Sequence, residues 1–190
     1  KNKMHHLHLE KKGLRGLAIA ESFKQGDTTS TLAGIVIRRD FIIDGFVFGK
    51  CTIEGDDATD AILEMYSRLN RDDISYILIS GLIISMYNII DIERIWEVTK
   101  IPVISVSYED SLGIEDSIRH HFPNSYEKKL EQYNKLGKRT TTTLHTGHKL
   151  FFRHEGCSSE DVVRFLDGLT LQGSIPEPVR VAQLLAKALH

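Results

Sequence analysis

The hydrophobic residues near the start of the chain fall in short runs that are typical of β-strands. Leu17 to Ala20, Leu32 to Arg38 and Phe41 to Phe48 are rich in isoleucine, valine and phenylalanine, which favour a pleated strand. Only Arg39 and Asp40 separate the second run from the third, and so short a connection is typical of a hairpin. The pattern therefore predicts an antiparallel three-stranded meander.

A helix and two strongly apolar runs are predicted next. Asp57 can begin a helix whose apolar stripe consists of Ala58, Ala61, Ile62, Met65 and Leu69. The runs Tyr76 to Ile79 and Ile101 to Val106 are apolar almost throughout, and a helical pattern separates them through Ile92, Ile95, Trp96 and Thr99. Strands buried on both faces and joined by a helix are usually parallel, with a right-handed crossover.

The second half of the chain predicts four helices and two more strands. Helices are expected over Leu112 to His121 and Tyr126 to Leu136, with strands near Thr140 to Leu144 and Lys149 to Arg153. A capping-box variant at Ser158 predicts the next helix. The last helix is expected to begin at Pro176-Glu177-Pro178 and to bury one stripe: Val181, Leu184, Leu185, Ala188 and Leu189. This order of elements predicts an α/β fold of the ribonuclease H-like type, a mixed sheet flanked by helices, although another α/β sandwich has a similar pattern.

Composition narrows the class of protein. A chain of 190 residues with 41% hydrophobic and 26% charged residues suits one soluble domain over residues 1–190. The net charge of -2 gives no overall attraction to nucleic acid or anionic lipid, so any polyanion site must be local. The apolar runs are too short to span a bilayer and no signal-peptide core is seen, which predicts a cytoplasmic protein without a membrane partner. Cys51 and Cys157 are expected to be packing residues.

Five segments in order along the chain resemble a known family. They are Lys11 to Arg15, Ile53 to Thr59, Tyr87 to Ile92, Ile101 to Ile104 and Pro176 to Ala182. Together they resemble endonuclease dU, a chiefly archaeal family related to endonuclease V. The resemblance implies a ribonuclease H-like domain that acts in DNA repair, cutting one strand near a deaminated base with Mg²⁺ or Mn²⁺ as the cofactor.

The resemblance also implies where the metal ligands should lie. Such enzymes place carboxylates at the ends of the first and fourth strands and near the start of the first helix, because Mg²⁺ prefers hard oxygen ligands. Here Ala20 and Ser80 stand at two positions where the resemblance implies aspartates. The remaining candidates for metal ligands are the following carboxylates: Glu21, Asp57, Asp91 and Glu54.

Two readings of these carboxylates stay open. Glu21 and Asp57 are the predicted catalytic pair, with Asp91 or Glu54 assisting. Alternatively, Asp57 is only the N-cap of its helix, Glu54 belongs to a solvated loop and Glu21 is a strand-end carboxylate. The chain is accordingly either a metal-dependent endonuclease on DNA containing deoxyuridine or deoxyinosine, or a catalytically degenerate domain that binds nucleic acid or protein.

Further candidates lie in the second half of the chain. His148 could act as a general base, or the segment from His145 to His148 could be a hairpin turn in which Gly147 supplies an unusual backbone angle. Arg180 could contact phosphate or form an ion pair within the last helix. A basic segment could contact DNA or another nucleic acid through Tyr133, Lys135, Lys138 and Arg139, or could be a solvated helix face.

A histidine-rich start offers one more candidate metal site. His5, His6 and His8 could bind zinc or nickel, although such a cluster more often belongs to a mobile or edge segment.

Overall fold

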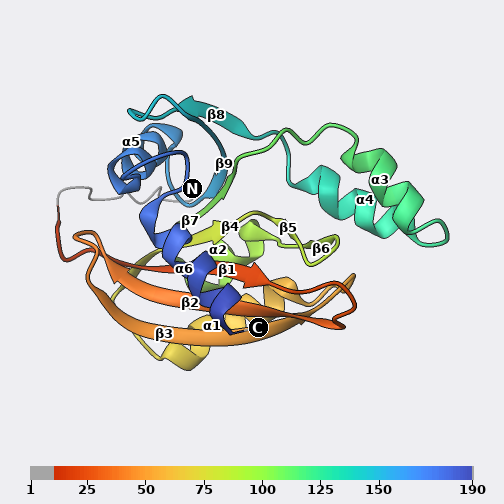
Figure 1. The fold of residues 1–190 in the computed structure, drawn as a ribbon, viewed down its shortest axis with the longest axis horizontal. Helices are drawn as coiled ribbons and strands as arrows, with labels where there is room; N and C mark the ends of the chain where they lie inside the picture. Colours follow the sequence, from red (N-terminus) through yellow and green to blue (C-terminus); the bar gives the residue numbers. More distant parts are fainter. Residues whose placement is uncertain (1–10, 190) are drawn as a thin grey trace.

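A mixed β-sheet runs through the molecule, and helices cover both of its faces (Figure 1). The computed structural model describes residues 11–189, and the histidines His5, His6 and His8 lie outside the described residues. The strand order is β3-β2-β1-β4-β7-β9-β8. This order agrees with the predicted ribonuclease H-like sheet.

The first three strands form the predicted antiparallel meander. They are β1 (Arg15–Ser22), β2 (Thr29–Arg38) and β3 (Ile43–Thr52). In the register, Ile19 lies opposite Gly34, and Gly34 lies opposite Val47. The hairpin between β2 and β3 is confirmed, but its turn is longer than predicted because Phe41 adopts a left-handed backbone angle, φ 69°.

Three parallel strands form the centre of the sheet, and the two contributed by the apolar runs were predicted to be parallel. β4 (Ile74–Ser80) pairs with β1 on one side and with β7 (Val103–Ser107) on the other. The chain crosses from β4 to β7 through α2 (Ile92–Thr99). Strands of this kind end at the same edge of the sheet, and that edge is where a ribonuclease H-like site is expected.

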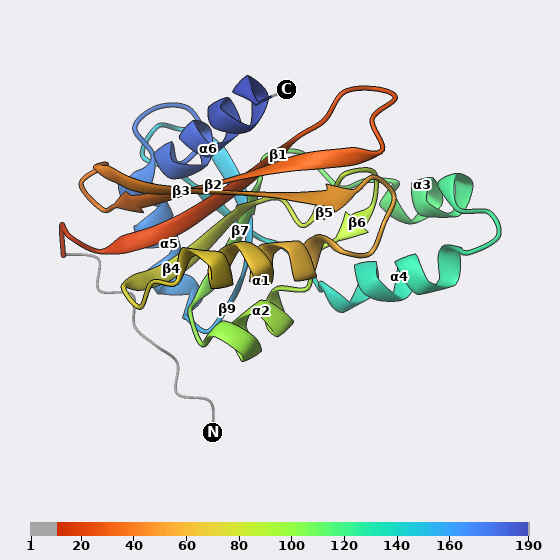
Figure 2. The same ribbon diagram turned by 90° about the horizontal axis from the view of Figure 1, so that it is seen from below.

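Helices on the two faces enclose two separate cores. α1 (Ala58–Leu69) and α2 cover one face, whereas α5 (Ser159–Leu169) and α6 (Glu177–Ala188) cover the other (Figure 2). Side chains of β4 alternate between them, so that Ile77 and Ile79 face α1 while Tyr76 and Leu78 face α5 and α6. Gly16 is required beside Tyr76, because an added Cβ would lie 2.0 Å from the Cζ of the ring.

The remaining elements extend the sheet and add a helical hairpin. β5 (Ile83–Ile84) and β6 (Asn88–Ile89) form a small antiparallel pair, and α3 (Ile114–His121) and α4 (Tyr126–Lys135) form a hairpin at one end of the molecule (Figure 1). β8 (Thr140–Thr143) and β9 (Lys149–Glu155) add two antiparallel strands beside β7. All were predicted, except the short pair β5 and β6.

The buried face of α6 differs from the prediction. The sequence predicted that Leu184 and Leu189 face the core, but they are 54% and 47% exposed. Val179, Ala182 and Ala186 are fully buried instead. α6 packs on β1 and β2, and small alanine side chains let the helix axis come close to the sheet, which leaves no room for the longer leucines.

Two of the three predicted helix starts, those of α5 and α6, follow their sequence signals. The Ser158 side chain accepts a hydrogen bond from the backbone N–H of Asp161 at 3.2 Å and caps α5. α6 begins at Glu177 with proline in its first turn, and Arg180 pairs with Glu177 there, with 2.9 Å between Nε and Oε2. Within residues 11–189, no helix has both the length and the apolar character needed to cross a bilayer.

Candidate nuclease-type rim and basic cavity

The ends of β1 and β4 place Ala20 and Ser80 on the same face of the sheet. Ile19 lies opposite Ile79 in the parallel register, so the next residue of each strand lies at the edge. Ala20 is buried in the core beneath α6. The Ser80 Oγ accepts a hydrogen bond from Nε2 of Gln183 on α6 at 3.1 Å. At the two positions where the resemblance implies aspartates, the rim is therefore uncharged.

Glu21 projects from the opposite face of β1 and is held by two serines. Its Oε1 accepts from the backbone N–H of Ser85 at 3.0 Å, and its Oε2 accepts from the Ser30 hydroxyl at 2.8 Å. The Ser85 hydroxyl also donates to Oε2. Ser85 is buried and has φ 48°, so the carboxylate fixes a strained segment between β5 and β6 onto the end of β1.

Asp57 occupies the N-cap position just before α1 but does not cap the helix with its side chain. Its carboxylate accepts from the backbone N–H and the hydroxyl of Thr52, at 2.9 and 2.7 Å, and from Nδ2 of Asn88 at 2.9 Å. The first amide of α1, that of Ala58, donates to Oδ1 of Asn88 instead, at 3.1 Å. The predicted side-chain cap is therefore wrong, because Asn88 takes the capping role from β6.

The pKa values of Asp57 and of the nearby Cys51 shift in opposite directions. Desolvation opposes ionisation of Asp57, but the hydrogen bonds from Thr52 and Asn88 outweigh it and lower the pKa of Asp57. Cys51 lies within reach of both carboxylates: burial raises its pKa to about 11, and the charges of Glu21 and Asp57 act in the same direction. Cys51 and Cys157 are buried free thiols, as the packing interpretation predicted.

The other two candidate ligands are engaged elsewhere. Asp91 caps α2, with its Oδ1 accepting from the backbone N–H of Arg94 at 3.2 Å, and its Oδ2 pairs with Lys135 at 2.9 Å. Glu54 is half exposed, with its Oε1 3.0 Å from Nε2 of His121 on α3. Its position on a loop agrees with the solvated-loop interpretation, with His121 as a neighbour.

These carboxylates do not gather around one point. Among residues 11–189, no three His, Cys, Asp or Glu side chains come close enough together to hold a metal ion. In these positions the donor set does not fit Mg²⁺ or Mn²⁺, which require several converging oxygen ligands. Metal ligation by Glu21, Asp57, Asp91 and Glu54 stays a prediction that requires them to exchange their present hydrogen-bond partners.

The turn between β8 and β9 has the geometry of an ordinary hairpin. Gly147 has φ 85°, as the turn interpretation requires, and His148 is exposed, with its Nδ1 3.2 Å from the Thr146 carbonyl oxygen. His145 contacts Asp167 at 2.8 Å between Nδ1 and Oδ1. The turn interpretation is confirmed, and the catalytic role of His148 stays a prediction.

The residues of the predicted basic segment differ in their hydrogen-bond and ion-pair partners. Lys135 is already paired with Asp91. Arg139 instead donates to the Ser107 hydroxyl at 2.9 Å and to the Glu109 carbonyl at 2.6 Å, and its guanidinium stacks 4.0 Å from the Phe151 ring centroid.

Sequence reasoning missed a second arginine beside Arg139. Arg153 of β9 donates to the Gly137 carbonyl oxygen through Nε and Nη2, at 3.2 and 3.1 Å. Burial lowers the pKa of Arg153, and the nearby charge of Arg139 lowers it further. Within the described part of the chain, Lys138, Arg139 and Arg153 form no ion pair with a carboxylate. We call these three residues the basic cluster.

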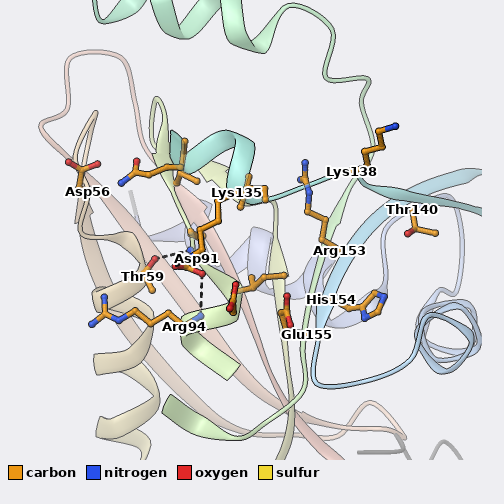
Figure 3. A pocket seen from close by; sticks show the side chains of 16 residues that line it. Asp56, Thr59, Asp91, Arg94, Lys135, Lys138, Thr140, Arg153, His154 and Glu155 are labelled. Carbon is orange, nitrogen blue, oxygen red and sulfur yellow. Dashed lines mark hydrogen bonds and ion pairs between the residues drawn. The ribbon is translucent and has the colours of Figure 1, made fainter. Parts of the chain in front are cut away.

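A cavity of about 300 Å³ opens beside the basic cluster, between α2, α4 and β9. In Figure 3, Arg153 and Lys138 lie on one side of it, and Thr59, Asp91 and Arg94 lie on the other. A second hollow of about 320 Å³, which Tyr133 and Arg139 also line, shares Lys138 and Arg153 with the cavity.

Comparison with known sequences identifies similar proteins over almost the whole chain. The family model described as endonuclease dU matches residues 12–190. A UPF0215 protein of Pyrobaculum calidifontis is 36% identical over 175 residues, which cover 92% of this chain and 96% of that protein. A UPF0215 protein of Archaeoglobus fulgidus is 28% identical over 177 residues, covering 92% and 93% of the two chains.

Solved structures share the fold. A protein of unknown function from Archaeoglobus fulgidus superimposes with a TM-score of 0.78 at 26% identity, covering 92% of this chain and 97% of that one. Endonuclease V of Ciona intestinalis, solved with a 24mer DNA containing inosine, gives 0.60 at 13% identity, covering 93% and 85%. Argonaute of Marinitoga piezophila, solved with guide RNA and target DNA, gives 0.54 at 14%, covering 94% of this chain and 30% of that one.

Proposed function

The chain belongs to the endonuclease dU family, and we propose that it binds nucleic acid on an endonuclease V-like fold without efficient metal-dependent cleavage. The observation that carries the proposal is the uncharged rim at the ends of β1 and β4. Ala20 offers no ligand there, and Ser80 is hydrogen-bonded to Gln183. Without carboxylates on that face, a divalent cation lacks the charge that would hold it next to a phosphodiester.

The basic cluster supports binding. Each of its residues carries a positive charge that no carboxylate of the described chain neutralises. Arg139 is held rigidly by Ser107, Glu109 and Phe151, so its guanidinium loses little conformational freedom when a phosphate approaches. Endonuclease V and Argonaute, which share this fold, were solved with DNA or RNA bound, which makes nucleic acid the best-supported class of partner.

Cleavage is the alternative proposal. A metal-dependent endonuclease acting on deoxyuridine or deoxyinosine would use Glu21 and Asp57 as ligands and catalytic groups, with Asp91, Glu54 or His148 assisting. That function requires Glu21 to release Ser85 and Asp57 to release Thr52 when a metal and a strand bind. The family membership favours it, and the hydrogen bonds that would have to break disfavour it.

One experiment separates the two proposals. Labelled oligonucleotides containing deoxyuridine, deoxyinosine or neither are incubated with the protein and Mg²⁺ or Mn²⁺, and nicking and binding are measured on the same samples. We expect binding at low salt and no nicking above that of a mock preparation. Metal-dependent nicking that disappears in Glu21→Gln would overturn the proposal and establish the endonuclease.

A gain-of-function variant tests the rim itself. Ala20→Asp with Ser80→Asp places two carboxylates on one face of adjacent strands, so we expect the double variant to bind Mn²⁺ more tightly than the wild type. Ala20→Asn with Ser80→Asn is the matched control, because it adds similar volume without charge. Equal Mn²⁺ affinity in both variants would contradict the account of the rim.

A further inference from the structure

The cavity beside the basic cluster is lined by groups of both charges and by an apolar wall. Lys138 and Arg153 lie on one side, and the rest of the lining combines the carboxylates Asp91, Glu93 and Glu155 with Arg94 and with Lys135, which is paired with Asp91. The apolar wall comes from Ile89, Ile90, Ile92 and Leu136. A volume of about 300 Å³ lies at the lower end of the range for small-molecule sites.

The basic end favours an anion with several oxygens. Arg153 is partly buried next to Arg139, and its guanidinium is bonded only to the Gly137 carbonyl oxygen among the described residues. Two arginines and a lysine that share one hollow repel one another, and a phosphate would remove that repulsion. The hydroxyls of Ser111 and Thr141 line the same hollow and can donate to phosphate oxygens.

The remainder of the cavity favours a ligand with N–H or O–H donors. Gln132 Oε1 is buried and has no hydrogen-bond partner in the described part of the protein. Glu155 and Glu93 offer carboxylate acceptors and would repel a phosphate. An anionic ligand should therefore bind with its phosphate away from these two side chains. Burial raises the pKa of Glu155, and the neighbouring charges of Glu93 and Asp91 act in the same direction.

We propose that this cavity and the adjoining hollow bind a nucleotide, with its phosphate at Lys138, Arg139 and Arg153 and its base against Leu136, where Gln132 Oε1 accepts a hydrogen bond from the base. A nucleotide combines the three features that the lining requires: an anion at one end, a flat apolar body and N–H donors. The site lies between α2, α4 and β9, apart from the strand ends at Ala20 and Ser80. When the nucleotide is the phosphorylated end of a nucleic-acid strand, this site rests on the proposed function, because it then binds one part of that strand.

Calorimetric titration of the full chain tests the site. The probes are AMP, IMP and UMP, with ribose 5-phosphate, adenosine and inorganic phosphate as partial ligands, and a short oligonucleotide with and without a 5′-phosphate. We expect at least one mononucleotide or the phosphorylated oligonucleotide to bind at least about tenfold more tightly than any partial ligand, because base and phosphate contacts add.

Three variants locate the binding. Lys138→Met should weaken it about tenfold, the effect expected for losing one charged hydrogen bond. Gln132→Leu should weaken nucleotide binding but leave inorganic phosphate unchanged. Lys187→Met is the control, because Lys187 is exposed on α6 across the sheet and should leave every affinity unchanged. Circular dichroism confirms that each variant is folded.

The outcomes distinguish the site from the proposed function. Binding of the phosphorylated oligonucleotide but of no free nucleotide supports the site and assigns it to a strand end. Equal binding of inorganic phosphate, ribose 5-phosphate and AMP overturns the nucleotide proposal, because the base then contributes nothing. Binding of both oligonucleotides equally, unchanged in Lys138→Met and Gln132→Leu, overturns the site but leaves nucleic-acid binding intact. Failure of every probe overturns both.

Discussion

Glu21 is a structural residue in its described position. Three donors from Ser85 and Ser30 converge on its carboxylate, and Ser85 has the left-handed backbone angle that such bonds must stabilise. The carboxylate that the sequence singles out as a metal ligand therefore holds the segment between β5 and β6. The sequence could not show this contact, because Glu21 and Ser85 are 64 residues apart.

Glu21→Gln should destabilise the protein. Glutamine replaces one carboxylate oxygen by an NH₂ group, which would face the hydrogen-bond donors that Glu21 now accepts from. We therefore expect a loss of about 1–3 kcal/mol in the free energy of unfolding, measured by urea denaturation. Glu64→Gln is the control. Glu64 is exposed, and its (i, i+4) ion pair with Arg68, at 3.6 Å, should contribute little to stability. If wild-type stability rose with Mn²⁺ and that rise disappeared in Glu21→Gln, Glu21 would be a ligand instead.

Tyr76 offers a contrasting change that should stabilise the protein. Its side chain is fully buried and packs edge-on against Phe165, with 4.6 Å between ring centroids, but its hydroxyl has no hydrogen-bond partner among the described residues. Tyr76→Phe removes an unpaired polar group and keeps the ring, so we expect a gain of about 1 kcal/mol in urea denaturation.

The control for Tyr76→Phe is Tyr126→Phe. Tyr126 is only partly buried, on α4, and we expect a change near zero there. A loss of stability in Tyr76→Phe would mean that the hydroxyl has a partner.

At the scale of elements, ionic contacts attach the hairpin of α3 and α4 to the body. Lys129 is 5% exposed and donates to the Gly55 carbonyl at 2.5 Å, to Asp56 Oδ1 at 2.7 Å and to the Tyr87 carbonyl at 2.7 Å. Lys135 adds an ion pair with Asp91. Carboxylates near the start of α1 and α2 therefore hold the hairpin that forms one wall of the cavity.

Lys129→Met should release this hairpin. The variant removes a buried ammonium that joins two backbone carbonyls to Asp56, whose side chain is 43% exposed, so we expect a loss of about 2 kcal/mol and faster amide exchange in α3 and α4. Lys128→Met is the matched control, because Lys128 reaches the same Asp56 at 3.3 Å from an exposed position and should contribute less than about 1 kcal/mol. Equal effects in the two variants would contradict the role of Lys129 in attaching the hairpin of α3 and α4.

Acidification should release the hairpin in the same way. Desolvation opposes ionisation of Asp56, but the hydrogen bonds and charges of Lys129 and Lys128 lower its pKa below the ordinary 3.8. The stabilisation is therefore complete above about pH 4 and is lost as the pH falls through the lowered pKa. Protection of the amides in α3 and α4, after correction for the intrinsic exchange rate at each pH, should fall at lower pH in the wild type and change less in Lys129→Met.

Periodicity predicted most elements, and it was wrong where residue size mattered more than hydrophobicity. The apolar runs of β4 and β7 and the stripe of α1 identify their buried faces directly. In α6, leucines dominate the pattern, whereas Ala182 and Ala186 make the contact because the helix lies close to β1 and β2. Helix-to-sheet distance is a tertiary property that one segment does not encode.

The site was harder to predict than the elements for the same reason. Asp57 looked like a side-chain cap, but Asn88, 30 residues from Ala58, performs that role. Arg153 carried no signal, because it becomes part of the basic cluster only when β9 pairs with β7 and Arg139 packs on Phe151. By contrast, the expectation of aspartates where Ala20 and Ser80 stand came from the family resemblance and not from the strand pattern.

For the whole molecule, a net charge of -2 must be reconciled with the proposed binding of nucleic acid. Many cations of the described chain are paired with nearby carboxylates, as Arg15 and Arg71 are with Asp44. Lys138, Arg139 and Arg153 line one hollow without such pairs, so binding at the basic cluster should depend on few phosphate contacts. The number of such contacts can be measured without knowing the sequence that is bound.

We expect single-stranded DNA binding to weaken with salt along a shallow slope. Three phosphate contacts release counterions so that log K falls with log salt concentration with a slope of about -2, far from the value of about -10 found for strongly basic interfaces. Fluorescence anisotropy at several KCl concentrations gives this slope. Lys138→Met with Arg139→Met should reduce its magnitude by about one or more, whereas Lys187→Met should not change it. A slope that is steep, or unchanged in the double variant, would mean that the strand follows a different surface from the basic cluster.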